Sequence, residues 1–305
     1  MRKLSLAALF AAASVIAVPA LAAPAGAFVD KYAQNGPVKI HYVVEGKGPL
    51  VVLIHGFPDY WATWKPLMAT LSKAGYRTAA LDTRGYNLSD KPQGVAAYAM
   101  PNLIDDVAAV IAAEGQKDAV VIGHDWGAAI AWQTVLNRPE LVNRLVIMAV
   151  PHPAGMAREL ATNKDQQANS QYARNFQKEG SEKNLTAERL ASMANKNPAE
   201  QAGYLEAFKR SDFAAMMNYY RANYPRIAPG DPPSAPVAYP KIKAPVLVIH
   251  GMKDTALNAQ GHAGTWNFVD ADSTIVMIPT AGHWVQHDAE AMVDRTVKDW
   301  LDARR

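Results

Sequence analysis

Asp125 is the middle residue of a pentapeptide that begins and ends with glycine and directly follows an apolar run. Residues 120–122 (Val-Val-Ile) lead into Gly123-His124-Asp125-Trp126-Gly127, and the Ala-rich segment 128–132 follows. A strand, a sharp turn and a helix in this order are typical of a nucleophile elbow, in which the flanking residues must be small. Asp125 occupies the position that serine usually takes, and an ionised carboxylate can attack a saturated carbon. The same aspartate could instead serve only as the N-cap of the helix.

A second loop could stabilise an anion that forms at Asp125. The apolar residues 50–54 lead directly into His55-Gly56-Phe57-Pro58. The glycine permits close approach of the backbone, and the Phe57–Pro58 bond could be cis. We predict that the backbone N–H groups of Phe57 and Trp126 form an oxyanion hole.

The other parts of a hydrolytic site come later in the chain. Asp254 follows the apolar run 245–250, and His283 follows the predicted strand 274–278; none of the other seven histidines has this placement. The chain order of acidic nucleophile, acid and histidine matches the nucleophile–acid–histidine order of α/β hydrolases. We therefore predict that Asp254 orients His283.

These residues need a scaffold that gathers the ends of several strands. Apolar runs predict strands at 38–44, 50–54, 78–82, 120–122, 145–150, 245–250 and 274–278, and amphipathic segments predict helices at 61–73, 103–114 and 289–301. The alternation predicts an α/β fold with a mostly parallel sheet and helices on both faces. Sites in such sheets lie at the carboxyl ends of the strands, where residues 55–58 and Asp125 both fall.

The chain divides into four predicted segments. Residues 1–22 have the basic start, apolar centre and small-residue end of a signal peptide, so we expect a periplasmic or secreted mature protein that begins near Ala23. An uncleaved anchor is the alternative. Residues 23–151 and 237–305 form the two parts of the core. Residues 152–236 are polar, helical in pattern and bounded by prolines, and we expect an inserted helical cap.

Composition excludes several classes of protein. The 305 residues are 50% hydrophobic, enough for a large core, and contain no cysteine. Removing Arg2 and Lys3 leaves 29 of the 31 basic residues against 28 acidic ones, without a basic stripe, so we expect no nucleic-acid partner. No later run reaches about 18 apolar residues, so we expect no membrane span after signal cleavage. No zinc-type spacing of ligands occurs, and we expect no metal or organic cofactor.

Over residues 38–303 the chain resembles the epoxide hydrolases of the α/β-hydrolase fold. Two cap tyrosines match that family: Tyr172 precedes Phe176-Gln177 by four positions, and Tyr220 lies in Asn218-Tyr219-Tyr220-Arg221. Asn87 departs from the family, which often has glycine after Arg-Gly-Tyr; the change affects the shape of that loop. The other matching motifs are His55-Gly56-Phe57-Pro58, Arg84-Gly85-Tyr86, Gly123-His124-Asp125-Trp126-Gly127, Lys253-Asp254 and Gly282-His283-Trp284.

The resemblance implies a two-step reaction that yields a vicinal diol. Tyr172 and Tyr220 would bind and protonate the epoxide oxygen while Asp125 attacks a ring carbon, which gives a covalent ester. Water activated by His283, with Asp254 behind it, would then hydrolyse the ester. We expect a small apolar epoxide and water as substrates, because aromatic residues surround the elbow. Contacts with the substrate are assigned to His55, Pro58, Trp61 and Trp284.

Three other functions use parts of the same pattern. A haloalkane dehalogenase would share the Asp125–His283–Asp254 triad, but a departing halide needs N–H donors, such as that of Trp126, rather than two phenols. An esterase does not fit, because an aspartate nucleophile would form an anhydride with a carbonyl substrate. A binding protein without activity would not need every catalytic position filled.

Overall fold

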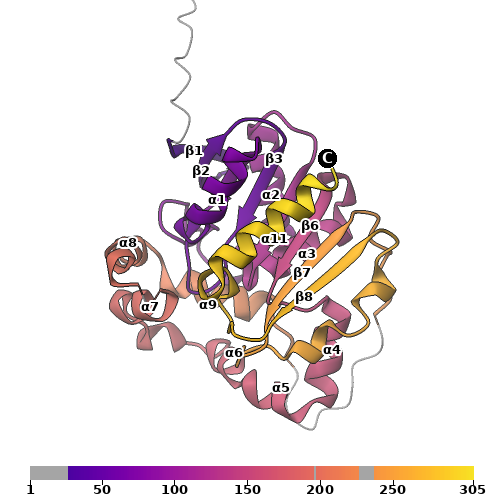
Figure 1. The fold of residues 1–305 in the computed structure, drawn as a ribbon. Coiled ribbons are helices and arrows are strands. Elements are labelled where there is room, and N and C mark those ends of the chain that lie inside the picture. The colour runs from indigo at the N-terminus through magenta and orange to yellow at the C-terminus, as the bar shows by residue number, and fades with distance from the viewer. Residues whose placement is uncertain (1–26, 196, 227–236) are drawn as a thin grey trace, which may run out of the picture.

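The computed structural model describes residues 27–195, 197–226 and 237–305 (Figure 1). The predicted signal peptide lies outside the described residues, as does the segment 227–236 at the end of the predicted cap. The division of the chain into these segments remains a prediction.

A single sheet of eight strands runs through the centre of the described structure (Figure 1). Its strands lie in the order β1-β2-β4-β3-β5-β6-β7-β8; β2 is antiparallel to both of its neighbours and all other pairs are parallel. The prediction of a mostly parallel α/β sheet is therefore confirmed. The strands are β1 (Val29–Asn35), β2 (Val38–Gly46), β3 (Leu50–Ile54), β4 (Arg77–Leu81), β5 (Ala119–His124), β6 (Val142–Met148), β7 (Val246–Gly251) and β8 (Ser273–Ile278).

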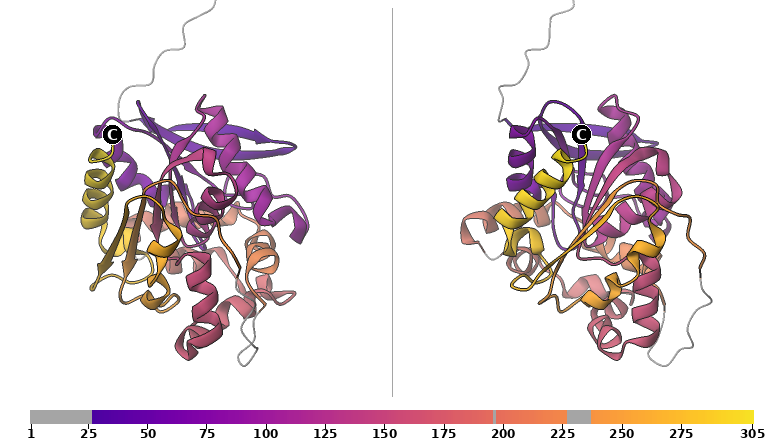
Figure 2. Two further views of the ribbon diagram at one scale, coloured as in Figure 1. Left: turned by 90° about the vertical axis from the view of Figure 1, so that its right-hand side faces the viewer. Right: turned by 45° about the vertical axis from the view of Figure 1, so that its right-hand side comes forward.

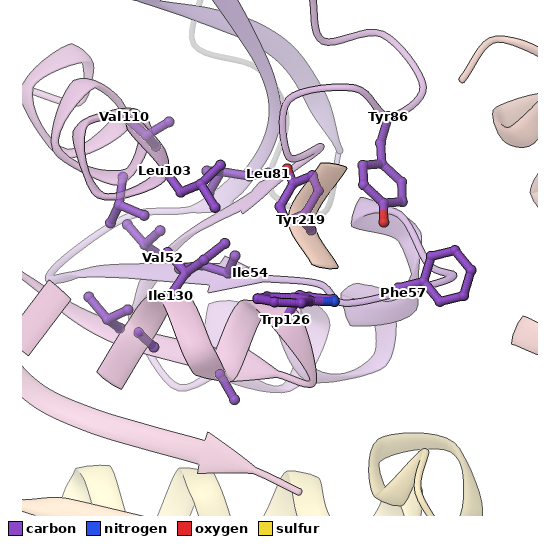
Figure 3. Close-up of a cluster of buried hydrophobic side chains, with 14 of the residues drawn as sticks. Val52, Ile54, Phe57, Leu81, Tyr86, Leu103, Val110, Trp126, Ile130 and Tyr219 are labelled. Atoms are coloured by element: carbon purple, nitrogen blue, oxygen red, sulfur yellow. The ribbon is translucent and has the colours of Figure 1, made fainter. Parts of the chain in front are cut away.

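Helices cover both faces of the sheet (Figure 2). Helices α1 (Lys65–Lys73) and α11 (Glu290–Asp302) pack on one face, and α2 (Met100–Ala113) and α3 (Trp126–Asn137) pack on the other. Because β3 lies between the two layers, its alternate side chains enter opposite cores and all five are buried. Figure 3 shows Val52 and Ile54 of β3 in the core that α2 and α3 share.

Among the described residues, six α-helices lie between β6 and β7 and sit at the end of the sheet where β6 finishes (Figures 1 and 2). Several begin at polar N-caps: the Asn163, Thr186, Asn197 and Asp212 side chains accept hydrogen bonds from N–H groups of the first turn. No helix in the described ranges is long and apolar enough to cross a membrane. The helices are α4 (Pro153–Thr162), α5 (Lys164–Asn169), α6 (Gln171–Phe176), α7 (Ala187–Ala194), α8 (Pro198–Lys209) and α9 (Phe213–Asn223).

The Arg84-Gly85-Tyr86 loop fixes α9 to the sheet domain. The Tyr219 hydroxyl donates to the Arg84 carbonyl at 2.8 Å. Gly85 has φ +90, and a Cβ there would lie 2.8 Å from the Cβ of Ala215, so the helix approaches the loop more closely than a larger residue allows. Asn87 takes φ 39 and donates its amide to Asp82 Oδ2 at 2.8 Å. Asparagine tolerates this left-handed conformation, which explains how it replaces the family's glycine.

One predicted helix is divided in the structure, and one strand was not predicted. The helix predicted at 61–73 begins as a 3₁₀ turn at Trp61–Trp64, and α1 starts at Lys65 because Pro66 suits only the first turn of a helix. Strand β1 was not predicted: its residues are mostly exposed and polar, so the sequence shows no apolar run there.

Candidate active site

Asp125 lies at a strained turn between β5 and α3. Its backbone has φ 51 and ψ −123, a conformation that is costly for any residue other than glycine. The carboxylate makes no capping hydrogen bond to the helix, which leaves it available for chemistry rather than N-capping. A Cβ on Gly123 would lie 2.2 Å from the Gly127 carbonyl oxygen, and a Cβ on Gly127 would lie 1.9 Å from the Ile54 carbonyl oxygen. The two glycines thus allow the turn to fold back on itself and against β3.

The loop after β3 supplies a donor to Asp125. The Phe57 N–H donates to Asp125 Oδ1 at 2.8 Å, and the Phe57–Pro58 peptide bond is cis. A Cβ on Gly56 would lie 2.4 Å from the Asp125 Cβ, so this position must be glycine for the loop to come so close. Trp126 is the first residue of α3, where backbone N–H groups lack an acceptor within the helix. The geometry suits the predicted pair of oxyanion donors.

His283 lies between two carboxylates. Its Nδ1 is 2.8 Å from Asp254 Oδ2, and its Nε2 is 3.4 Å from Asp125 Oδ2. Asp254 follows β7, and its other oxygen accepts the N–H groups of Ala256 at 2.7 Å and Leu257 at 3.0 Å. The Asp254 side chain is fully buried, and those of Asp125 and His283 are 10% exposed. The structure thus joins the three predicted residues in one chain of contacts.

The charges of this triad depend on one another. Burial alone would lower the pKa of His283, but the Asp254 and Asp125 carboxylates override it and raise the pKa to about 10. Burial would raise the pKa of Asp125 and Asp254, but the imidazolium holds both below their usual range. In the free protein at neutral pH, therefore, a protonated His283 lies between two ionised aspartates.

The His283 loop is held by two further side chains that the sequence analysis did not predict. His124 Nε2 lies 2.8 Å from the His283 carbonyl oxygen, and Gln286 Nε2 lies 3.3 Å from His124 Nδ1. Burial, followed by the charge of His283, lowers the pKa of His124 to about 3, so its ring is neutral. The neutral ring can donate through Nε2 and accept from Gln286 through Nδ1. Because His124 immediately precedes Asp125, this bond couples the nucleophile turn to the histidine loop.

An apolar cavity of about 360 Å³ opens at Asp125. Both predicted tyrosines line it, with their ring centres 6.2 Å apart. The described residues around it are mostly apolar or aromatic: Met100, Trp126, Ala129, Trp132, Gln133, Val150, Pro151, Pro153, Met156, Ala157, Asn223, Tyr224, Pro225, Val237, Tyr239 and Leu257. Such a lining suits an apolar ligand with a few polar groups to orient it.

The two tyrosines come from different cap helices that one amide ties together. Tyr172 lies in α6 and Tyr220 in α9. The Gln177 side chain, just after α6, donates to the carbonyl oxygens of Tyr220 at 3.2 Å and Tyr224 at 2.8 Å. Burial first, and then the Asp125 charge, raises the pKa of both phenols well above the usual value. Both are therefore neutral proton donors.

The four predicted substrate contacts do not border this cavity. The His55 ring is buried and occupied, because Nε2 accepts the Thr83 N–H at 3.0 Å and Nδ1 lies 2.9 Å from the Gly56 carbonyl oxygen. Pro58 is buried within the same loop. Trp61 packs against Phe28, with ring centres 5.6 Å apart.

Trp284 packs against the His283 ring, with ring centres 5.1 Å apart. We predicted these contacts from their nearness to the elbow. The residues that line the cavity come instead mainly from α3, the start of α4 and the end of α9, and most of them lie outside the motifs of the sequence. Within the described ranges, no cluster of three or more histidine or acidic side chains could hold a metal ion.

Comparison with known proteins decides the family. The family model described as the alpha/beta hydrolase fold matches residues 49–290. The chain is 31% identical to Epoxide hydrolase 1 of Caenorhabditis elegans, over 90% of this chain and 70% of that protein. The chain belongs to the epoxide hydrolase family of the α/β-hydrolase fold. Enzymes of this family are hydrolases that act on ether bonds.

Two further proteins are similar to this chain, one an epoxide hydrolase and the other a member of the wider AB hydrolase superfamily. A solved structure of Bacillus megaterium epoxide hydrolase in complex with an inhibitor has a TM-score of 0.82 and 28% identity, and covers 89% of this chain and 100% of that one. The AB hydrolase superfamily protein YfhM of Bacillus subtilis is 32% identical over 89% of this chain and 97% of its own length. The resemblance inferred from the motifs is thus confirmed.

Replacement of Gly127 by alanine tests the tightness of the turn. Because the new Cβ would lie 1.9 Å from the Ile54 carbonyl oxygen, we expect Gly127→Ala to lower the free energy of unfolding by about 3 kcal/mol or more. The control is Gly36→Ala, at φ +55 with nothing within 4 Å, which should cost only about 1 kcal/mol of backbone strain. Urea denaturation of both variants measures the difference. Equal losses would contradict the steric explanation.

Proposed function

We propose that this protein hydrolyses small apolar epoxides to vicinal diols through a covalent ester on Asp125. The observation that carries the proposal is that a carboxylate and two neutral phenols line one apolar cavity. A nucleophile below a ring carbon and proton donors above the ring oxygen are what opening of an epoxide requires. Membership in the epoxide hydrolase family supports the same reaction.

In the first step, Asp125 Oδ2 attacks a ring carbon. Oδ1 accepts the Phe57 N–H at 2.8 Å, whereas Oδ2 has only the longer contact of 3.4 Å with His283 Nε2, so Oδ2 is the less constrained oxygen. As the new C–O bond forms, the ring C–O bond breaks, and the leaving oxygen takes a proton from Tyr172 or Tyr220. The products are an alkyl ester on Asp125 and one tyrosinate.

In the second step, water attacks the carbonyl carbon of the ester. Esterification removes the Asp125 charge that helps to hold the proton on His283, so the imidazolium first releases that proton to solvent. The neutral His283 then removes a proton from the attacking water, and the negative oxygen that develops is Oδ1, which already faces the Phe57 N–H. Each donor of such a hole is worth roughly 3 kcal/mol in acyl transfer. Collapse of the intermediate breaks the ester bond, His283 returns its proton to the departing diol oxygen, and the proton of the restored carboxyl group reprotonates the tyrosinate.

The tyrosine pair favours epoxides over haloalkanes. A halide leaves as an anion and needs N–H donors, whereas an alkoxide needs a proton, which two neutral phenols can give. The dehalogenase alternative therefore has no function for Tyr172 or Tyr220.

Removal of the phenol hydroxyls should slow ring opening. We expect Tyr172→Phe and Tyr220→Phe each to slow formation of the ester by about tenfold or more, and the double variant by about 10³-fold, because Phe keeps the ring but not the proton. Stopped-flow or quenched-flow kinetics with an aryl epoxide measures this step. Ester formation at the parental rate in the double variant would contradict the assignment.

Removal of the base should trap the ester. We expect His283→Gln to alkylate once and then stall, with ester hydrolysis slowed by about 10³-fold. Mass spectrometry of the intact protein should show an increase equal to the mass of the epoxide. Asp125→Asn is the matched control and should show no increase, because an amide is a poor nucleophile. A His283→Gln variant that turns over without accumulating ester would contradict the covalent route.

Ester hydrolysis should accelerate as the pH rises. His283 has a pKa raised to about 10 in the free protein, partly by the Asp125 charge. Esterification removes that charge, so the pKa falls in the intermediate, and hydrolysis needs the neutral ring. We expect the rate of ester decay to rise about tenfold per pH unit below this lowered pKa and to level off above it. Single-turnover decay measured across pH gives the profile; a rate that falls with rising pH would contradict the role of His283 as base.

A further inference from the structure

A second cavity borders the catalytic histidine. It has a volume of about 430 Å³ and is bordered by α7, the start of α8, the loops that carry Asp254 and His283, and the start of α11. Its lining is largely polar or charged, unlike that of the cavity at Asp125. The described lining residues are Met193, Ala194, Asn195, Asn197, Glu200, Lys253, Thr255, Gly282, His283, Trp284, His287, Asp288 and Glu290.

The two cavities have no lining residue in common. Asp125 borders the apolar cavity and His283 borders the polar one, and the two side chains are 3.4 Å apart at Asp125 Oδ2 and His283 Nε2. One member of the catalytic pair therefore borders each cavity. The nucleophile borders the apolar cavity, which suits an apolar substrate. The base borders the polar cavity, which suits water.

The polar cavity contains groups that would hold water. Its lining includes the charged side chains of Glu200, Lys253 and Asp288, which hydrogen-bond to water rather than to an apolar ligand. On the cap side, the Asn195 amide donates to Glu200 at 2.5 Å, and on the core side His287 Nε2 lies 2.9 Å from Thr63 Oγ1. A cavity with such hydrogen-bonded polar side chains around it suits water better than an apolar ligand.

We propose that the polar cavity supplies the water that hydrolyses the Asp125 ester, while the epoxide reaches Asp125 through the apolar cavity. This inference rests on the proposed function, because only a covalent intermediate needs a separate water. Once Asp125 is esterified, the alkyl group fills the apolar cavity, and water from that side would have to pass it. Water on the side of His283 meets its base without displacing the bound alkyl group.

A larger side chain at the cavity edge tests the proposal. Met193 lies on α7, is 38% exposed and borders the polar cavity. Tryptophan there would fill part of the cavity. We expect Met193→Trp to slow decay of the ester by about tenfold and to leave the rate of ester formation unchanged. The measurement is a single-turnover quench with an aryl epoxide, with the ester followed by mass spectrometry of the intact protein.

The matched control is Met292→Trp on α11. Met292 is also a helical methionine with 38% exposure, but it does not border the cavity. Both rates should stay at the parental value. Glu290→Trp, at an exposed cavity-lining position, is the second test variant and should reproduce the slow decay even if Met193→Trp folds poorly.

Three outcomes would overturn the proposal. Parental decay rates in folded Met193→Trp and Glu290→Trp would show that water arrives by another route. Slower ester formation with unchanged decay would show that this cavity admits the epoxide. A parental protein that forms neither ester nor diol would contradict the proposed function itself, and the supply of water with it.

Discussion

The site depends on one imidazole held between two buried carboxylates. Bringing two negative charges out of water is costly, and the arrangement is stable because each carboxylate has further partners. Asp254 is compensated by two backbone N–H groups, and Asp125 by the Phe57 N–H. The positive His283 between them stabilises both. When Asp125 loses its negative charge, the pKa of His283 falls. Formation of the ester in the first step thus prepares His283 to act as the base in the second.

The sheet makes this arrangement possible. Strands β3, β5 and β7 are parallel members of one sheet, so the residues that follow them meet at one edge. Phe57, Asp125 and Asp254 each come just after one of these strands. The small residues Gly56, Gly123 and Gly127 then remove the side chains that would hold the turns apart. The catalytic groups are thus positioned mainly by where the strands end and by the glycines beside them.

Chemistry that depends on local motifs could be predicted from the sequence, and contacts between distant segments could not. The parallel sheet, the turn at Asp125 and the His283–Asp254 pairing follow from apolar runs and the residues that end them. Strand β1 was missed because pairing with β2, rather than its own pattern, makes it a strand. His124 lies within the nucleophile motif, but nothing in the sequence marks its pairing with Gln286 and the His283 carbonyl, because these contacts join residues more than 150 positions apart. For the same reason the sequence did not show which residues line the cavity at Asp125.

Gln177 has a consequence for how the cap and the sheet domain work together. Its amide spans α6 and α9 by binding two carbonyl oxygens at the end of α9. The helices that carry Tyr172 and Tyr220 are therefore cross-linked to each other by a contact that does not involve the sheet domain. Because α9 is itself held to the Arg84 carbonyl through Tyr219, the same amide extends that attachment to α6 and Tyr172. One contact between helices thus sets the spacing of the two acids, and one contact with the Arg84 loop sets their distance from the nucleophile.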